Sequence, residues 1–241
     1  MSSIMNTSDV ITFSMQARRE GQKQYEAGNL DAAAGAFRNA TNQNPRDYVS
    51  FYYLGEIYRQ QGREQMASQA YQTSLRVQPE TNTGKADLEQ RTRTAQAFAN
   101  FLATASSRET ELDGFIANVQ KRNTPTDWYV LALVYAQTQD ADNAIDAYNH
   151  AIVLAGDDFA VQKSYGLYLT ELNQRERAVP VLRKAYQLDP TDTQITAALR
   201  KFGIVPGPSL LQEEQMAKPV MPRGPLPEVE LNIRDRSSSA R

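Results

Sequence analysis

The sequence contains no cysteine, one histidine (His150) and one tryptophan. The absence of cysteine excludes disulfides, thiolate zinc sites and cysteine nucleophiles. A single histidine has no second imidazole or thiolate with which to hold a metal ion, so we expect His150 to be a solvated surface residue. Phosphate-binding glycine loops, nucleophile elbows and helical zinc motifs are also missing. The residues therefore favour a protein with no catalytic, metal or cofactor site.

The chain also lacks an excess of charge of either sign. Its 26 Lys and Arg residues nearly balance its 28 Asp and Glu residues, which leaves a net charge of −2. No global field therefore attracts nucleic acid or an anionic membrane. The densest basic group, Arg91 and Arg93 with Lys85 nearby, is interspersed with Asp87 and Glu89. We expect this group to be a solvated helix face.

Long hydrophobic runs are absent as well. No stretch approaches the ~18 apolar residues that cross a bilayer. Residues 1–15 lack the basic and apolar regions of a signal peptide. With Met1 taken as the start, we expect no membrane insertion and a cytoplasmic location. Hydrophobic residues still make up 41% of the chain, which is typical of a folded protein with a packed core.

The sequence does have an internal repeat of 34 residues. Pro45 and Pro79 each follow an amphipathic segment, and they lie 34 residues apart. Alignment on these two prolines superposes four further columns, which are Gly21 with Gly55, Gly28 with Gly62, Ala33 with Ala67 and Phe37 with Tyr71. The second half has the same pattern, in Trp128-x2-Leu131-Ala132-x2-Tyr135, Ala144-x3-Tyr148, Tyr165-Gly166-x2-Leu169, Ala178-x3-Leu182 and Pro190.

This pattern resembles the tetratricopeptide repeat family, whose signature is aromatic-x2-Leu-Gly-x2-Tyr, then Ala-x3-aromatic, then Pro. The best match is Phe51-x2-Leu54-Gly55-x2-Tyr58, followed by Ala67-x3-Tyr71 and Pro79. The resemblance implies an all-α fold, a right-handed superhelical solenoid of antiparallel helix pairs. We expect four repeats, at 14–47, 48–81, 125–158 and 159–192.

Particular residues are expected to shape each helix pair. A small residue should lie where the two helices cross closely, at Gly21, Gly55, Ala132 and Gly166. A left-handed turn should end the first helix at Gly28 and Gly62. Proline should stop the second helix at Pro45, Pro79 and Pro190, and Pro180 predicts a local kink. Helix caps are expected at Asn29, Ser107, Asp140 and Asp158.

Residues 82–124 break the 34-residue phase but keep the apolar spacing of helices. We expect a divergent helical hairpin that continues the stack, because two repeats alone are usually too few to be stable. The alternative is a linker between two lobes of two repeats each. The other expected segments are a flexible N-terminus (1–13), a capping helix (193–204) and a proline-rich, largely disordered tail (205–241). The tail is either a plain tail, a partner-binding segment or a segment that folds back into the groove.

In the family that the sequence resembles, the first helix of each repeat lines a concave surface that receives a peptide. The resemblance therefore implies a mixed aromatic, apolar and charged peptide-binding surface. Its expected residues are Arg18, Gln22, Tyr25, Tyr52, Glu56, Arg59, Tyr129, Leu133, Gln137, Lys163, Leu167 and Glu171. Tyrosine offers contact area at low entropic cost, and Arg or Lys can bind a carboxylate.

The leading hypothesis is a non-catalytic interaction scaffold that binds a partner peptide or helix in this groove. The alternative is a structural assembly factor, or a self-associating component of a larger complex such as one of the cell envelope, that uses its convex face or tail. Both hypotheses predict protein partners, no nucleic acid and no cofactor. The sequence leaves the oligomeric state open.

Overall fold

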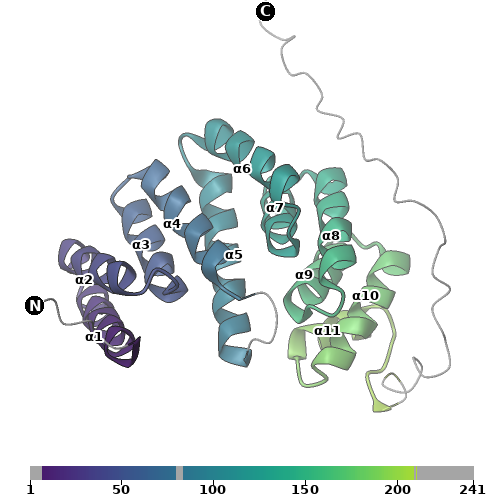
Figure 1. The fold of residues 1–241 in the computed structure, drawn as a ribbon. Helices are drawn as coiled ribbons and strands as arrows, with labels where there is room; N and C mark the ends of the chain where they lie inside the picture. The colour runs from purple at the N-terminus through teal and green to yellow at the C-terminus, as the bar shows by residue number, and fades with distance from the viewer. Residues whose placement is uncertain (1–6, 80–83, 209, 211–241) are drawn as a thin grey trace, which may run out of the picture.

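The computed structural model describes residues 7–79, 84–208 and 210, and within them it contains eleven α-helices and no strand. The helices lie side by side in an arc, with α1 and α2 at one end and α10 and α11 at the other (Figure 1). Their bounds are α1 (Thr7–Glu26), α2 (Leu30–Gln43), α3 (Tyr48–Gln60), α4 (Glu64–Val77), α5 (Lys85–Thr104), α6 (Arg108–Arg122), α7 (Pro125–Gln137), α8 (Ala141–Ala155), α9 (Phe159–Glu171), α10 (Arg175–Leu188) and α11 (Thr193–Lys201). The all-α architecture expected from the repeat is confirmed.

Four helix pairs share one turn geometry. In α1–α2, α3–α4, α7–α8 and α9–α10 the turn residue has a left-handed φ, at Gly28 (78°), Gly62 (70°), Gln139 (60°) and Asn173 (55°). In the second pair, Gly62 N–H donates to the carbonyl of Arg59 (3.1 Å) and Arg63 N–H donates to the carbonyl of Tyr58 (2.8 Å), and the other three turns repeat this pattern. These bonds satisfy carbonyls at the helix end. The predicted left-handed turns at Gly28 and Gly62 are confirmed.

The small residues lie where the paired helices cross. A Cβ atom added to Gly21, Gly55 or Gly166 would lie 2.8 Å, 2.7 Å or 2.7 Å from a side chain of the opposite helix. The residues met are Phe37, Tyr71 and Leu182, each sixteen positions further along the chain. All three are fully buried. The close crossings predicted at these glycines are confirmed, and they set the spacing of the helices.

The predicted helix ends are mostly confirmed. The helices α2, α4 and α10 each end two residues before a proline, at Gln43, Val77 and Leu188. Asp140 and Asp158 cap α8 and α9 by accepting hydrogen bonds from backbone N–H groups of the first turn. α10 continues through Pro180.

Two residues expected to cap helices occupy the N-cap position, as predicted, but make no side-chain cap bond. Asn29 makes no side-chain cap bond to α2, and its amide donates instead to Gln24 Oε1 (2.9 Å). Ser107 likewise makes no cap bond to α6, because its hydroxyl donates to Glu64 Oε2 (2.6 Å). In both cases the side chain expected to cap the helix donates its hydrogen bond to a residue outside the first turn of that helix.

The helices α5 and α6 continue the stack. α5 packs against α4 on one side and α7 on the other, and one buried cluster runs through both halves. Ala99 and Phe115 are separated by the same sixteen residues as Gly55 and Tyr71, and both are buried. α3 begins seven residues before Gly55, whereas α5 begins fourteen residues before Ala99. Ala99 lies 44 residues after Gly55 instead of 34, and most of the extra residues form two added turns, Lys85 to Arg91, at the start of α5.

Both ends differ in part from expectation. α1 begins at Thr7, so residues 7–13, expected to be flexible, form its first turns, and residues 1–6 lie outside the described part. α11 ends at Lys201 and covers the core with Ile195, Leu199 and Phe202. Leu210 is also buried, and its carbonyl accepts a hydrogen bond from Gln187 Nε2 (3.3 Å) on α10. The expectation for residues 211–241 lies outside the described residues.

Candidate interaction surface

α3 places three of the expected ligand-binding residues on one side, since positions four and three apart share a helix face. These residues are Tyr52, Glu56 and Arg59. The carboxylate of Glu56 accepts a hydrogen bond from Tyr71 Oη (2.5 Å) at Oε1 and one from Arg59 Nη2 (3.0 Å) at Oε2. Glu56 is thereby fixed by the core, and it orients Arg59, whose side chain is 42% exposed. The negative charge of Glu56 is therefore fixed in position, whereas the positive charge of Arg59 is on an exposed side chain.

Tyr25 from α1 joins this surface. Its hydroxyl accepts a hydrogen bond from Gln60 Nε2 (2.9 Å) of α3, and its ring meets Tyr53 edge-on at 5.2 Å. Tyr53 in turn stacks on the buried Phe37 (4.9 Å) and contacts the ring of Tyr52 (5.3 Å). The half-buried rings of Tyr25 and Tyr52 are thus held in place by Tyr53, which itself stacks on the buried ring of Phe37.

Arg93 of α5 completes the surface, and the sequence did not assign it there. Burial and, to a smaller extent, the carboxylate of Glu56 raise the pKa of Tyr52 to about 12, and the guanidinium of Arg93 partly opposes this rise. Arg93 therefore lies within electrostatic reach of Tyr52, although the two residues belong to different hairpins. We call Tyr25, Tyr52, Glu56, Arg59 and Arg93 the N-terminal face.

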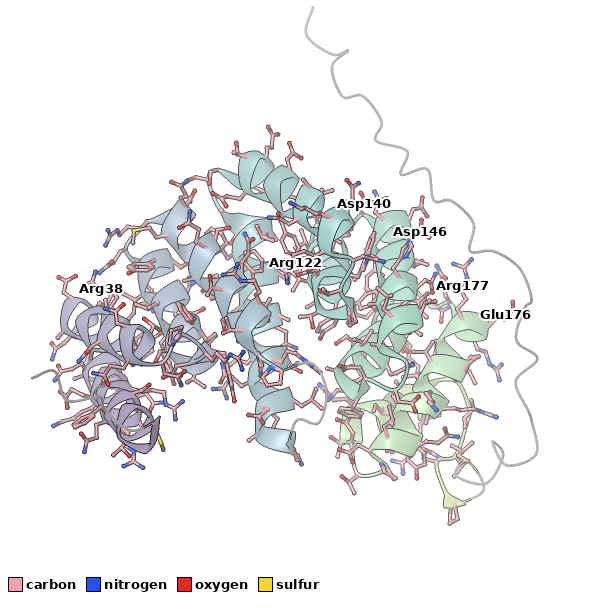
Figure 2. All side chains as sticks on the ribbon, viewed as in Figure 1. Arg38, Arg122, Asp140, Asp146, Glu176 and Arg177 are labelled. Carbon is pink, nitrogen blue, oxygen red and sulfur yellow. The ribbon has the colours of Figure 1, made fainter. Side chains whose placement is uncertain are left out.

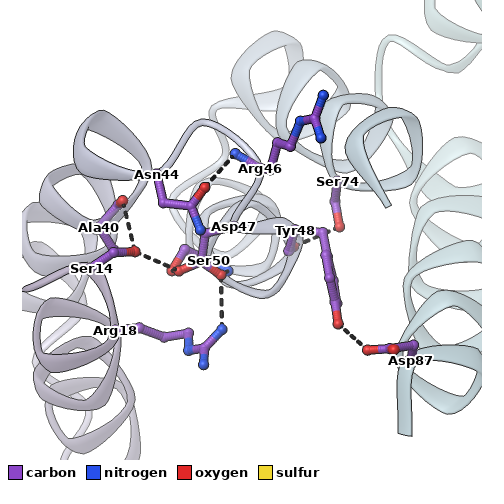
Figure 3. Close-up of polar contacts among 10 residues, drawn as sticks. All are labelled: Ser14, Arg18, Ala40, Asn44, Arg46, Asp47, Tyr48, Ser50, Ser74 and Asp87. Carbon is purple, nitrogen blue, oxygen red and sulfur yellow. Dashed lines mark hydrogen bonds and ion pairs between the residues drawn. The ribbon is translucent and has the colours of Figure 1, made fainter. Parts of the chain in front are cut away.

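Arg18 and Lys163 are engaged elsewhere. Arg18 Nη1 lies 3.1 Å from Asp47 Oδ1, as Figure 3 shows, and Lys163 Nζ lies 2.6 Å from Asp192 Oδ2. Both aspartates are N-caps, of α3 and α11, so each cation joins the first helix of a hairpin to the helix that follows that hairpin. A ligand that used either cation would have to compete with a carboxylate already in place.

Tyr129 is not on an open surface, contrary to expectation. Its side chain is 3% exposed, its hydroxyl lies 2.8 Å from Ser164 Oγ, and burial raises its pKa to about 12. Most of α7 is buried, from Thr126 to Ala132 and at Val134, and α5 packs along it. The run from Trp128 to Ala136 is apolar nearly all round except for its tyrosine hydroxyls, a pattern typical of a helix covered on every side.

The other expected residues are spread along the arc. Leu133 and Leu167 are half-buried and pack against the core, so they offer partial apolar contact in the second half. Gln22 is half-buried, and Gln137 and Glu171 are exposed. The structure thus gathers Tyr25, Tyr52, Glu56 and Arg59 into one face and does not gather the rest with them.

Two residues expected to be solvated are not. Arg91 is 8% exposed and forms an ion pair with Asp158 (2.8 Å). The half-buried ring of His150 stacks on Trp128, with 4.3 Å between the ring centroids. Among the residues that the structure describes, no group of three His, Asp or Glu is arranged to hold a metal ion. In the same part of the chain, no helix has the length and apolar character to cross a membrane.

Comparison with solved structures finds several helical repeat proteins. YrrB, a TPR protein with an unusual peptide-binding site, is 13% identical, with 78% of this chain and 92% of that chain covered and a TM-score of 0.42. Residues 41 to the end of MamA from Desulfovibrio magneticus RS-1 are 15% identical, with 75% and 97% covered and a TM-score of 0.41. TTC0263, a thermophilic TPR protein from Thermus thermophilus, is 18% identical, with 78% and 97% covered and a TM-score of 0.45.

Comparison with curated proteins finds no match. Two family models, each described as a tetratricopeptide repeat, do match the sequence. One matches residues 18–81, and the other matches residues 128–158 and 164–192. Together they span more than half of the 241 residues. The chain belongs to the tetratricopeptide repeat family.

Proposed function

We propose that the protein is a non-catalytic scaffold that binds an extended or helical segment of a partner protein at the N-terminal face. The observation that carries the proposal is the pair of fixed tyrosine rings, Tyr25 and Tyr52, beside the exposed guanidinium groups of Arg59 and Arg93. Tyrosine and arginine dominate the binding energy of many protein interfaces, because they offer large contact areas and directed hydrogen bonds. The fold and the family support a role in protein interaction.

The partner segment would combine an apolar side chain with an acidic group. The two tyrosine rings are ordered by Tyr53 and Gln60 in the free protein, so binding costs little side-chain entropy there. Within the described residues Arg93 forms no ion pair, whereas Arg59 is partly neutralised by Glu56. Arg93 is therefore the side chain best placed to bind a partner carboxylate.

Affinity capture with matched variants tests this proposal. The test variant is Tyr52→Ala/Arg93→Ala, and the control is Arg38→Ala/Arg76→Ala, which removes two exposed arginines from second helices, α2 and α4. Figure 2 labels Arg38 on α2. Partners that bind the wild type and the control but not the test variant would support the N-terminal face. Equal capture by all three proteins would contradict it.

A second candidate function is self-association through the outer helices. Val153 and Leu154 at the end of α8 are 65% and 41% exposed, and Leu188 at the end of α10 is 38% exposed. Leu154 and Leu188 are 34 residues apart, so they occupy the same position in successive repeats. Sedimentation velocity should then show dimers that Val153→Lys/Leu188→Lys removes. A wild-type monomer at all concentrations tested would exclude this candidate.

A further inference from the structure

The first two turns of α5, Lys85 to Arg91, have no counterpart in α3, α7 and α9, whereas α1, at the N-terminal end of the arc, is as long as α5. α3, α7 and α9 each begin seven residues before their small crossing residue, at Gly55, Ala132 and Gly166. α5 begins fourteen residues before Ala99. The added turns therefore project beyond the hairpin that α5 forms with α6. The repeat pattern does not predict which residues they contact.

On one side, the added turns contact the α3–α4 hairpin. The hydroxyl of Tyr48, at the start of α3, donates to Asp87 Oδ1, as Figure 3 shows. Gln78, at the end of α4, donates from Nε2 to the carbonyl of Asp87 (2.5 Å). Arg91 Nη1 donates to the carbonyl of Pro79 (3.5 Å). The start of α3 and the end of α4 are thus both hydrogen-bonded to α5.

On the other side, the added turns reach α9. Arg91 Nη2 lies 2.8 Å from Asp158 Oδ2, and the two side chains are only 10% and 16% exposed. Asp158 is the N-cap of α9, so the contact passes over the whole α7–α8 hairpin. In a solenoid each repeat ordinarily contacts only its sequence neighbours. This ion pair is a departure from that rule.

A second basic residue of the added turns, Lys85, interacts with the C-terminal part of the arc. The pKa of Asp189, which follows α10, is lowered first by hydrogen bonds from Thr191 and to a smaller extent by the positive charge of Lys85. Lys85 is the first residue of α5. The start of α5 therefore lies within electrostatic reach of the junction between α10 and α11.

We propose that the first two turns of α5 form a clasp that joins the α3–α4 hairpin to the start of α9. The clasp restricts bending of the arc at α5 and α7, because movement of either end has to break a largely buried ion pair. It also makes the opening of α9 depend on α5, although the two helices belong to non-adjacent hairpins. This inference does not depend on the proposed ligand-binding role of the N-terminal face.

Hydrogen exchange of the full chain tests the clasp with two variants. Asp158→Asn keeps a residue that caps helices as well as Asp does, but removes the charge that Arg91 meets. Arg91→Met keeps the apolar stem and removes the guanidinium. We expect Asp158→Asn to raise amide exchange in residues 87–92, and Arg91→Met to raise exchange in residues 160–164, each by about tenfold, which corresponds to about 1.4 kcal/mol of lost coupling.

A neighbouring ion pair provides the control. Lys163 and Asp192 join α9 to the N-cap of α11, the helix that follows the α9–α10 hairpin. Lys163→Met should raise exchange at the start of α11 and leave residues 87–92 as in the wild type. The clasp is supported if the effect of each of its two variants appears in the distant segment. An effect confined to the segment that carries the substitution, in both Arg91→Met and Asp158→Asn, would overturn it.

Discussion

The crossing glycines reverse the usual effect of a glycine-to-alanine change. In an open helix interior, alanine is more stable than glycine by about 1 kcal/mol. At Gly55 the added methyl group would lie 2.7 Å from the ring of Tyr71, which is fully buried and hydrogen-bonded to Glu56. Because the ring has no free space into which to move, the helices themselves would have to separate.

We therefore predict that Gly55→Ala lowers the free energy of unfolding by about 1–3 kcal/mol, the usual cost of overpacking a core. Gly35→Ala is the matched control, since Gly35 lies inside α2 and an added methyl group would meet nothing within 4 Å. This control should raise the free energy of unfolding by about 0.5–1 kcal/mol. Urea unfolding of the wild type and both variants measures these free energies. If both substitutions changed the free energy of unfolding in the same direction, the close crossing at Gly55 would be contradicted.

The only tryptophan and the only histidine of the chain are in contact, which provides an internal optical probe. Trp128 is only 7% exposed, and the imidazole ring of His150 stacks on one face of its indole ring. We predict that His150→Ala shifts the emission of Trp128, because loss of the imidazole ring exposes that face to water.

The far-ultraviolet circular dichroism of His150→Ala should stay unchanged. Fluorescence spectra of the wild type and the variant, recorded in the same buffer, test the prediction. Identical spectra for the two proteins would show that the stack does not form in solution.

At the scale of single elements, Glu64 fixes the loop between α5 and α6. Its carboxylate accepts hydrogen bonds from the hydroxyls and backbone N–H groups of Ser106 and Ser107, at 2.6–2.9 Å. These bonds lower the pKa of Glu64 from 4.5 to about 2. Because the folded-state pKa lies below the unfolded one, the stabilisation is present above about pH 4.5 and is lost as the pH falls toward 2.

We predict that Glu64→Gln makes the free energy of unfolding less dependent on pH between about 5 and 2. Chemical unfolding of the wild type and the variant at several pH values within this range measures the effect. Glu111→Gln is a suitable control, since Glu111 lies on the adjacent α6 and accepts no comparable set of bonds among the described residues. Parallel pH profiles for all three proteins would contradict the assigned role.

The regular repeats could be predicted from the sequence because their turns and crossings need particular residues. Gly28 and Gly62 mark left-handed turns, since glycine adopts a positive φ without strain. The equivalent turns at Gln139 and Asn173 carry no such mark, and only their place in the repeat reveals them. The absence of side-chain cap bonds at Asn29 and Ser107 could not be predicted, because Gln24 and Glu64 compete for these side chains.

The candidate surface could be predicted only in part. The repeat identifies which side of α3 holds Tyr52, Glu56 and Arg59, but it does not reveal that α5 covers Tyr129 or supplies Arg93. Both facts follow from the position of α5, and the sequence hides that position because two added turns break the phase. The sixteen-residue spacing of Ala99 and Phe115 is the signal from which it could have been found.

At the scale of the whole molecule, the arc has two unlike halves. The first half, from α1 to α5, presents aromatic and charged side chains that the core holds in place. In the second half, α7 is largely buried and Lys163 is paired with Asp192. The best-ordered polar and aromatic side chains expected to bind a partner therefore lie in the first half, and this asymmetry is the basis of the proposed function.

Site-directed photocrosslinking in cells tests this central claim most directly. A photoreactive phenylalanine analogue would replace Tyr52 in one protein and the exposed Arg38 of α2 in another. We predict that position 52 forms a discrete crosslinked protein adduct, that Arg93→Ala weakens this adduct, and that position 38 does not form it. An adduct from position 38 with none from position 52 would contradict the assignment of partner binding to the N-terminal face.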